Sequence, residues 1–271
     1  MANQIYAFAN QKGGVGKTTS CINLAASLVL SKKRILVCDL DPQGNATMGS
    51  GVDKNALDAS MNELLQGTAK AQDVVISQTP AGYDLIPANS DLTEAEVVLL
   101  KKHGQQPLFL VKALSALKED YDYIFLDCPP SLNMLTVNAL SAADAVIIAM
   151  QCEYFALEGL TDLVNTVKQL QATLNPRLHI GAIIRTMFDG RNRLAAEVSS
   201  QLLEHFGNKV FQTVIPRNVR LAEAPSYGLP VQLYDKHSRG SAAYSALAGE
   251  FLRKEKAALK KETLKREKVK G

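Results

Sequence analysis

The segment from residue 12 to residue 19 holds residue types that bind phosphate. Three glycines near its start let the backbone turn tightly and aim successive N–H groups at one point. The helix expected to follow adds partial positive charge, and the lysine and threonine that open it suit phosphate oxygens and Mg²⁺. We therefore predict a nucleotide phosphate site, with the hydroxyl of Thr18 on Mg²⁺, formed by Lys12, Gly13, Gly14, Val15, Gly16, Lys17, Thr18 and Thr19.

Acidic residues follow two of the apolar segments that we expect to be strands. Asp41 stands directly before a proline, and Asp127 stands two residues before a proline pair. The prolines keep the chain extended, so each acid is presented from a loop. Carboxylates at the carboxyl ends of parallel strands can hold Mg²⁺, directly or through water, and can orient an attacking water. We predict a metal site that comprises Thr18, Asp41 and Asp127.

The elements that must position these residues alternate along the chain. Apolar runs alternate with helical patterns, which is typical of βαβ units around a parallel sheet. Strands are expected at residues 4–9, 34–40, 123–127, 145–150, 179–184 and 209–215. Helices are expected at residues 17–30, 59–66, 93–102, 108–118, 157–173 and 193–205, and from 240 onward. The predicted fold class is α/β, with a doubly wound, mostly parallel sheet and helices on both faces.

Composition and charge indicate a cytoplasmic protein with an anionic partner. Hydrophobic residues make up 46% and charged residues 21%, and no apolar run reaches membrane-spanning length. The four cysteines form no C-x-x-C pair, so we expect reduced, buried thiols. Residues 250–271 hold nine Lys/Arg and four Asp/Glu, a balance of +5, and the remaining 249 residues sum to 3 − 5 = −2. A basic end favours an anionic partner, although most charge runs are solvated helix.

Lys12 relates the phosphate segment to a known family. The usual pattern G-x-x-x-x-G-K-[ST] would place glycine at Gln11, whereas this chain has a lysine directly before Gly13. This deviant Walker A form resembles the ParA/MinD family of ATPases. Residues 215–226, continued at 233–235 and 238–240, are similar to the small chromosomal-type ParA (Soj) proteins. The resemblance implies a P-loop ATPase domain over residues 1–250, followed by a basic helical tail over residues 251–271.

The same resemblance implies roles for individual residues. Each Lys12 would reach across a dimer interface to the nucleotide of the other subunit, and Lys17 would contact phosphate in its own subunit. Asp41 corresponds to the acid that positions the hydrolytic water, and Asp127 to the Walker B-type acid near Mg²⁺. Asp39 is expected to be a structural neighbour of the metal. The resemblance places the adenine of ATP near Thr186, Met187, Pro216, Arg217 and Asn218.

The implied function is partition of a chromosome or plasmid. ATP would join two subunits into a homodimer that binds double-stranded DNA without reading its sequence. A ParB-type, centromere-bound partner would stimulate hydrolysis and release the subunits, so the protein would be associated with the nucleoid. Resemblance places the principal DNA contacts at Arg191 and Arg220, and we expect Arg217, Arg193, Lys236 and the basic tail to assist.

Other functions fit the sequence less well. A MinD-like regulator at a membrane surface is the main alternative, but the apolar residues of the tail are spread too thinly for a membrane-binding face. An iron–sulfur electron carrier would need two suitably placed cysteines per subunit, and Cys128 has no evident partner. A guanine nucleotide would call for N-K-x-D, and the nearest candidate, residues 208–211, lacks the final acid. A small-molecule phosphotransferase remains open, although nothing suggests a second substrate pocket.

Overall fold

The structure is a computed structural model that describes residues 3–101 and 109–270, with side chains described up to residue 261. Within those ranges, one sheet runs through the molecule, and all its strands are parallel. Its order is β3-β2-β4-β1-β5-β6-β7. The strands are β1 (Gln4–Phe8), β2 (Ile35–Asp39), β3 (Asp84–Ile86), β4 (Tyr123–Asp127), β5 (Ala145–Gln151), β6 (His179–Phe188) and β7 (Val210–Pro216).

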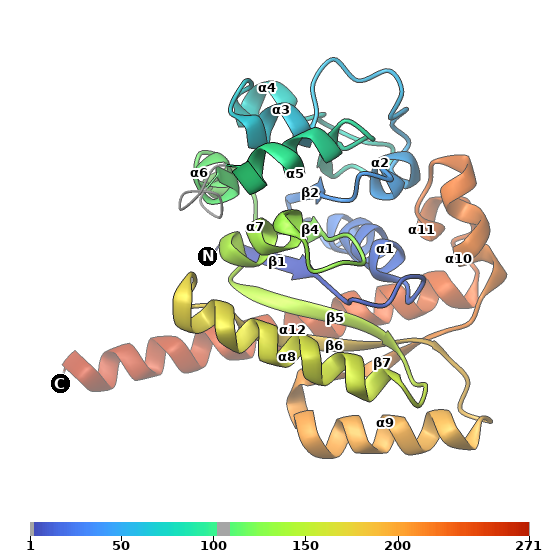
Figure 1. The fold of residues 1–271 in the computed structure, drawn as a ribbon. Helices are drawn as coiled ribbons and strands as arrows, with labels where there is room; N and C mark the ends of the chain where they lie inside the picture. The colour runs from blue at the N-terminus through green and yellow to red at the C-terminus, as the bar shows by residue number, and fades with distance from the viewer. Residues whose placement is uncertain (1–2, 102–108, 271) are drawn as a thin grey trace.

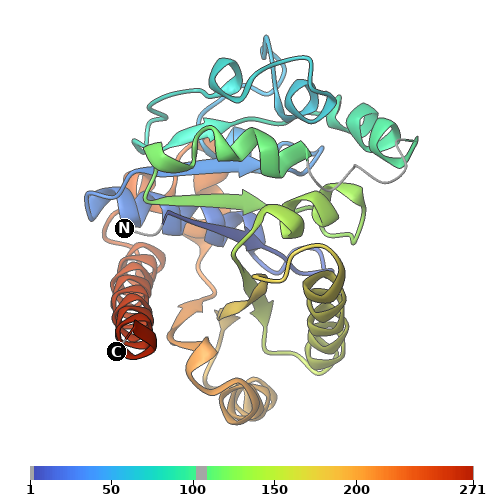
Figure 2. The ribbon, with the colours of Figure 1, turned by 90° about the vertical axis from the view of Figure 1, so that its left-hand side faces the viewer.

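Helices cover both faces of the sheet, so its central strands are buried on both sides (Figures 1 and 2). The helices on one face are α1 (Lys17–Leu30), α10 (Val219–Glu223), α11 (Val231–Tyr234) and α12 (Arg239–Lys270). Those on the other face are α3 (Met61–Gln66), α4 (Ala71–Val74), α5 (Leu92–Lys101), α6 (Phe109–Ser115), α7 (Met134–Ala142), α8 (Ala156–Thr173) and α9 (Arg193–Phe206). This arrangement confirms the predicted doubly wound α/β fold, and the sheet is entirely parallel.

Several elements of the sheet layers were not predicted, namely β3, α4, α7, α10 and α11. β3 has only three residues, too few for a recognisable apolar run, and it pairs with β2 at the edge of the sheet. α7 is buried along most of its length, so its sequence lacks the polar face that marks a surface helix. The helix end predicted at Lys102 and the helix start predicted at Leu108 lie outside the described residues.

The last helix is continuous across the boundary that the sequence suggested at residues 250 and 251. α12 begins at Arg239 and extends to Lys270, which confirms a helix running into the charged tail. Phe251 is 2% exposed, and its ring packs against those of Tyr6, Tyr123 and Phe125 on the sheet. The first turn of the proposed tail is therefore anchored to the same core as the sheet. The division of the chain at that point stays a prediction.

The predicted phosphate-binding segment and the predicted acids lie at the carboxyl ends of the strands. β2 and β4 are neighbours, and Asp39 pairs in register with Asp127. β1 lies on the other side of β4 and leads through the glycine-rich segment into α1. Figure 1 shows the segment after β1 and the chain after β4 at the same edge of the sheet. The fold thus brings the phosphate loop and the predicted acids together.

Candidate nucleotide site

The glycine-rich segment turns from the end of β1 into the first turn of α1. Gly14 and Gly16 have φ values of 72° and 85°, a left-handed conformation that disfavours other residues. Gly16 is the N-cap of α1 and offers no side chain to the first turn, which leaves N–H groups of that turn available to a ligand. Thr186 of β6 donates a hydrogen bond from its hydroxyl to the carbonyl of Val15, at 2.7 Å, which fixes the loop against the sheet.

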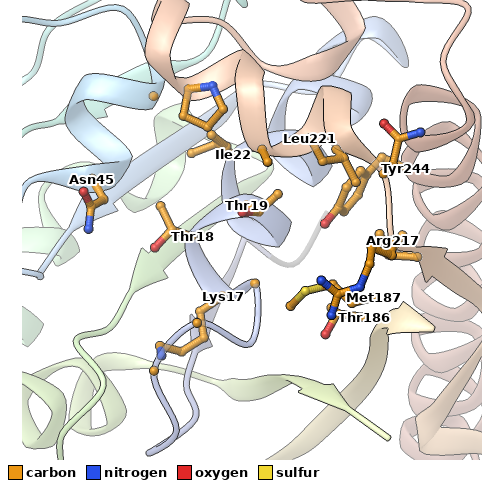
Figure 3. Close-up of a pocket in the computed structure, with 18 of the residues that line it drawn as sticks. Lys17, Thr18, Thr19, Ile22, Asn45, Thr186, Met187, Arg217, Leu221 and Tyr244 are labelled. Atoms are coloured by element: carbon orange, nitrogen blue, oxygen red, sulfur yellow. The ribbon is translucent and has the colours of Figure 1, made fainter. Parts of the chain in front are cut away.

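Lys17 is held inside this loop. It is 6% exposed, and its Nζ atom donates to the carbonyl of Lys12 at 3.2 Å. Burial lowers the pKa of Lys17, whereas the nearby Asp127 and Asp41 carboxylates favour its charged form. Lys17 also borders a cavity of about 780 Å³, together with Thr18 and Thr19 (Figure 3). A cation held against a rim of backbone N–H groups is suited to phosphate oxygens.

Asp39 and Asp41 have different surroundings although only one residue separates them. Asp39 is fully buried and accepts hydrogen bonds from the backbone N–H of Asp41 and from both the N–H and the hydroxyl of Thr47, at 2.7 to 3.0 Å. Burial raises the pKa of Asp39 to about 6, against those hydrogen bonds. Asp41 borders the cavity, and one of its oxygens accepts from the N–H of Gln43 at 3.0 Å. Asp39 therefore holds the loop in place, whereas Asp41 borders the cavity.

Asp127 provides the test of whether a cation fits this site. Both its carboxylate oxygens are buried, and neither has a hydrogen-bond partner of normal geometry among residues 3–101 and 109–270. Burial, together with the Asp39 carboxylate, raises the pKa of Asp127, while the Thr18 hydroxyl and Lys17 favour its charged form. An unpaired buried carboxylate costs several kcal/mol, on the order of 2–7 for a polar group, unless a partner compensates it. A water-coordinated cation beside Thr18 would supply that partner.

The described residues contain no group of three or more His, Cys, Asp or Glu side chains that could hold a metal alone. Mg²⁺ in nucleotide sites is usually bound through one or two carboxylates together with substrate phosphates and water, so such a group is not needed. Thr18, Asp41 and Asp127 lie at one edge of the sheet and match that limited donor set. Their roles as metal ligands stay predictions.

The predicted adenine residues border the same cavity as the phosphate loop. Met187 and Arg217 are labelled near each other in Figure 3, at the opposite side of the cavity from Asn45. Met187 has a φ of 48°, a left-handed conformation that costs a methionine roughly 1–2 kcal/mol and is often found at functional sites. Asn218 uses its side-chain oxygen to cap α10, so its side-chain amide remains for a ligand. The structure thus gathers Thr186, Met187, Pro216, Arg217 and Asn218, and their contact with adenine stays a prediction.

Sequence reasoning missed much of the apolar wall of the cavity. Tyr244 of α12 is 1% exposed, and its hydroxyl lies 3.0 Å from that of Ser20 in α1. No local motif marks these residues, because they come from helices that meet only in the folded chain. Ile22 and Met48 also border the cavity and were not singled out, whereas Ile215, Leu221 and Pro225 lie within the segment of residues 215–226 that the sequence analysis noted.

Lys12 lies outside the cavity that its own loop surrounds. Its Nζ atom is 2.5 Å from a carboxylate oxygen of Glu153, which follows β5. Both side chains are about half exposed, at 49% and 50%. Lys12 is not among the residues that border the cavity, whereas Lys17 is. The sequence did not indicate Glu153 as a partner of Lys12, since 141 residues separate the two.

The predicted DNA-contacting arginines are exposed but differ in their partners. Arg191 forms two hydrogen bonds with the carboxylate of Asp189, at 2.8 and 2.9 Å. Arg220 pairs with Glu223 at 2.8 Å and with Asp235 at 3.2 Å. Arg217 makes no ion pair with any residue that the structure describes. The sequence did not indicate Asp235 as a partner of Arg220.

No helix in the described part of the chain is long and apolar enough to cross a membrane.

Comparisons with known proteins show the family to which the chain belongs. A family model described as an AAA domain matches residues 3–180. The chromosome partitioning protein ParA of Caulobacter vibrioides is 46% identical over 93% of this chain and 95% of its own length. The sporulation initiation inhibitor protein Soj of Bacillus subtilis is 48% identical over 91% of this chain and 97% of its own length.

A solved structure is also similar to this chain in fold and in sequence. The crystal structure of cobyrinic acid a,c-diamide synthase from Mycobacterium smegmatis, with bound ATP analog and magnesium, has a TM-score of 0.81. It is 34% identical to this chain and covers 94% of it and 96% of its own length. This enzyme has a different name from ParA and Soj, and its identity to this chain is lower than theirs.

Proposed function

This chain belongs to the ParA/Soj family of partitioning ATPases, and we propose that it works as an ATP-switched dimer that binds and leaves DNA. ATP and Mg²⁺ are its cofactors. The observation that carries the dimer proposal is the position of Lys12. The phosphate loop already has one buried lysine, Lys17, at the cavity, while Lys12 stands outside it on the surface. A second lysine placed there is available to a neighbouring subunit.

We assign different roles in ATP binding and hydrolysis to different residues of the site. The loop N–H groups and Lys17 would hold the phosphates, while Thr18 and Asp127 would hold Mg²⁺, which supplies neutralising charge for the phosphate oxygens. Asp41 would accept a hydrogen bond from the attacking water and orient it. The Lys12 of the second subunit would then complete the site with one more positive charge. Each subunit would thus lack a full set of phosphate contacts until the dimer forms.

We propose that the dimer acts on DNA. Arg191, Arg217 and Arg220 are exposed near the same edge of the sheet, so dimerisation would double their number on one particle. Backbone phosphates dominate sequence-independent binding to DNA. A ParB-type protein would stimulate hydrolysis, release the subunits and so drive partition of a chromosome or plasmid at the nucleoid. The relatives named ParA and Soj support this proposal.

The ion pair between Lys12 and Glu153 leads to a prediction about the monomer. Lys12 must leave Glu153 to reach another subunit, so the pair opposes dimerisation. Exposed ion pairs contribute about 0.2–1 kcal/mol, so Glu153→Gln should lower the dimer dissociation constant up to about fivefold per released lysine. Sedimentation equilibrium in the presence of ATP, in an Asp41→Ala background that prevents turnover, measures this constant.

Glu158→Gln is the matched control for that variant. Glu158 is an exposed acid on the adjoining helix α8 with no ion pair in the described residues, so its loss should leave the dissociation constant unchanged. A dimer that is equally stable or weaker in Glu153→Gln, compared with this control, would show that Glu153 does not restrain Lys12.

A second prediction concerns Arg220 and DNA. Arg220→Ala removes one cation per subunit, so up to two phosphate contacts per dimer should be lost. Each contact contributes about 0.9 to the slope of log affinity against log salt, so the slope should fall by about two units for every DNA sequence. Arg34→Ala is the control, since Arg34 is also an exposed, ion-paired arginine but lies just before β2, at the amino ends of the strands. Fluorescence anisotropy with duplex DNA at several salt concentrations gives the slopes. If the wild-type protein with ATP ignores DNA at low salt but binds anionic liposomes, the DNA proposal is wrong.

A further inference from the structure

A lysine that has no part in the proposed function holds the loop that carries Asp41. The Nζ atom of Lys54 donates a hydrogen bond to the backbone carbonyl of Gln43 at 2.6 Å. Gln43 borders the nucleotide cavity, as do Asp41 and Asn45, the last of which is labelled in Figure 3. Lys54 does not border that cavity, so it contacts the loop from outside. The sequence did not indicate Lys54 as a functional residue.

The turn from Asp41 to Gly44 has its own hydrogen bonds, which keep its shape. One carboxylate oxygen of Asp41 accepts from the N–H of Gln43 at 3.0 Å, and the carbonyl of Asp41 accepts from the N–H of Gly44 at 2.8 Å. At the start of the turn, the N–H of Asp41 donates to the Asp39 carboxylate at 3.0 Å. Asp39 therefore anchors the start of the turn to β2, and Lys54 anchors its apex.

The side chain of Lys54 is itself held in place. Gly44 has a φ of 62°, and a Cβ atom there would lie 2.9 Å from Cδ of Lys54 and 2.6 Å from the carbonyl oxygen of Ala88. The stem of Lys54 therefore lies directly against the loop backbone, at a position that only glycine leaves open. The backbone of Lys54 lies in a turn in which a carboxylate oxygen of Asp53 accepts from the N–H of Asn55 at 2.9 Å. This turn fixes one end of the side chain, and the hydrogen bond to the loop fixes the other.

The chemistry of this contact suits a fixed tether. A hydrogen bond from a charged donor is shorter and stronger than one between neutral groups. The acceptor is a neutral carbonyl, and no carboxylate of the described residues pairs with Lys54 in competition. We propose that Lys54 is a positioning residue for ATP hydrolysis, which holds Gln43 so that the Asp41 carboxylate stays where it orients the attacking water. This inference rests on the proposed role of Asp41.

Three variants of lysine separate the hydrogen bond from the bulk of the side chain. Lys54→Met keeps an unbranched stem but removes the donor, and a misplacement of about 1 Å in a catalytic group can cost about 10²-fold in rate. Hydrolysis should therefore slow by up to about 10²-fold, while ATP affinity stays unchanged because the phosphate loop is untouched. Lys54→Arg keeps a charged donor and should restore most of the rate. Lys168→Met is the matched control, since Lys168 is an exposed lysine on α8, which packs against β6 and not β2.

The experiment measures the rate, the affinity and the loop separately. Single-turnover hydrolysis is followed with the full chain well above its dimer dissociation constant, so that the rate reports on the chemical step. Binding of a fluorescent ATP analogue gives the affinity. Hydrogen exchange of the peptide that spans residues 41–47, with Mg·ATP bound, follows the loop itself. Exchange there should be faster in Lys54→Met and should match the wild-type protein in Lys54→Arg and Lys168→Met.

The outcomes separate the role of Lys54 from the proposed function. Slow hydrolysis at unchanged ATP affinity in Lys54→Met, with recovery in Lys54→Arg, supports the proposal. The double variant Lys54→Met/Asp41→Ala should then be no slower than Asp41→Ala, because both changes act on one step. A normal rate in Lys54→Met beside a slow Asp41→Ala, or a Lys54→Arg variant as slow as Lys54→Met, overturns the role of Lys54 alone. A normal rate in Asp41→Ala overturns the proposed role of Asp41, and positioning through it.

Discussion

Asp41→Ala should bind Mg·ATP and form a dimer, yet hydrolyse ATP about 10²–10⁴-fold more slowly than the wild-type protein. Asp41 borders the nucleotide cavity, and only one of its carboxylate oxygens is engaged, by the N–H of Gln43. The other oxygen is available to orient a water. The phosphate loop and Lys17 do not depend on it, so ATP affinity should persist. Single-turnover phosphate release, together with binding of a fluorescent ATP analogue, measures the two properties separately.

Asp41→Asn is the control that separates charge from loop shape. Its side-chain oxygen can still accept from the N–H of Gln43, so the loop should keep its form while the negative charge is lost. Both variants should therefore be slow. Normal turnover in either variant would remove Asp41 from the hydrolytic step. Loss of ATP binding in Asp41→Asn would instead make Asp41 a metal or structural residue.

Lys12→Ala should still bind nucleotide but should lose ATP-dependent dimerisation and hydrolysis. Lys12 does not border the cavity of its own subunit, so its removal leaves the phosphate loop intact. Truncation of one partner in a buried charged contact at an interface costs about 2–5 kcal/mol, so the dimer should weaken at least about 30-fold. The dimer dissociation constant with ATP, together with the steady-state rate of phosphate release, gives the two effects.

Lys17→Ala is the contrasting variant. Lys17 is buried at the cavity, so its loss should abolish nucleotide binding itself rather than only the dimer. The two variants would then fail at different steps: Lys17→Ala at nucleotide binding, and Lys12→Ala at dimerisation. Equal ATP affinity, dimerisation and turnover in Lys12→Ala and the wild-type protein would contradict a role for Lys12 across the interface.

The fold could be predicted because its central strands carry a strong local signal. β1, β4 and β5 are buried on both faces, so their sequences are continuous apolar runs. β3 could not be recognised, since three residues paired at the edge of a sheet have no pattern of their own. α7 was missed for a different reason. A helix that is buried on most sides has no polar face, so its sequence lacks the helical alternation of apolar and polar residues.

The site was predictable where a few consecutive residues determine it. The phosphate loop is such a case, because its glycine conformations and its position before α1 follow from adjacent residues. The ion-pair partners of Lys12 and Arg220 could not be predicted, because Glu153 and Asp235 come close to them only in the folded chain.

The particle mass of Asp41→Ala in each nucleotide state is the most direct test of an ATP-switched dimer. One chain has a mass of 29.4 kDa. Light scattering behind size exclusion should give that mass with Mg·ADP or without nucleotide, and twice that mass with Mg·ATP. The double variant Asp41→Ala/Lys12→Ala should stay at the mass of one chain in all three conditions. A single mass for Asp41→Ala in every nucleotide state, or a dimer in the double variant with ATP, would contradict the account.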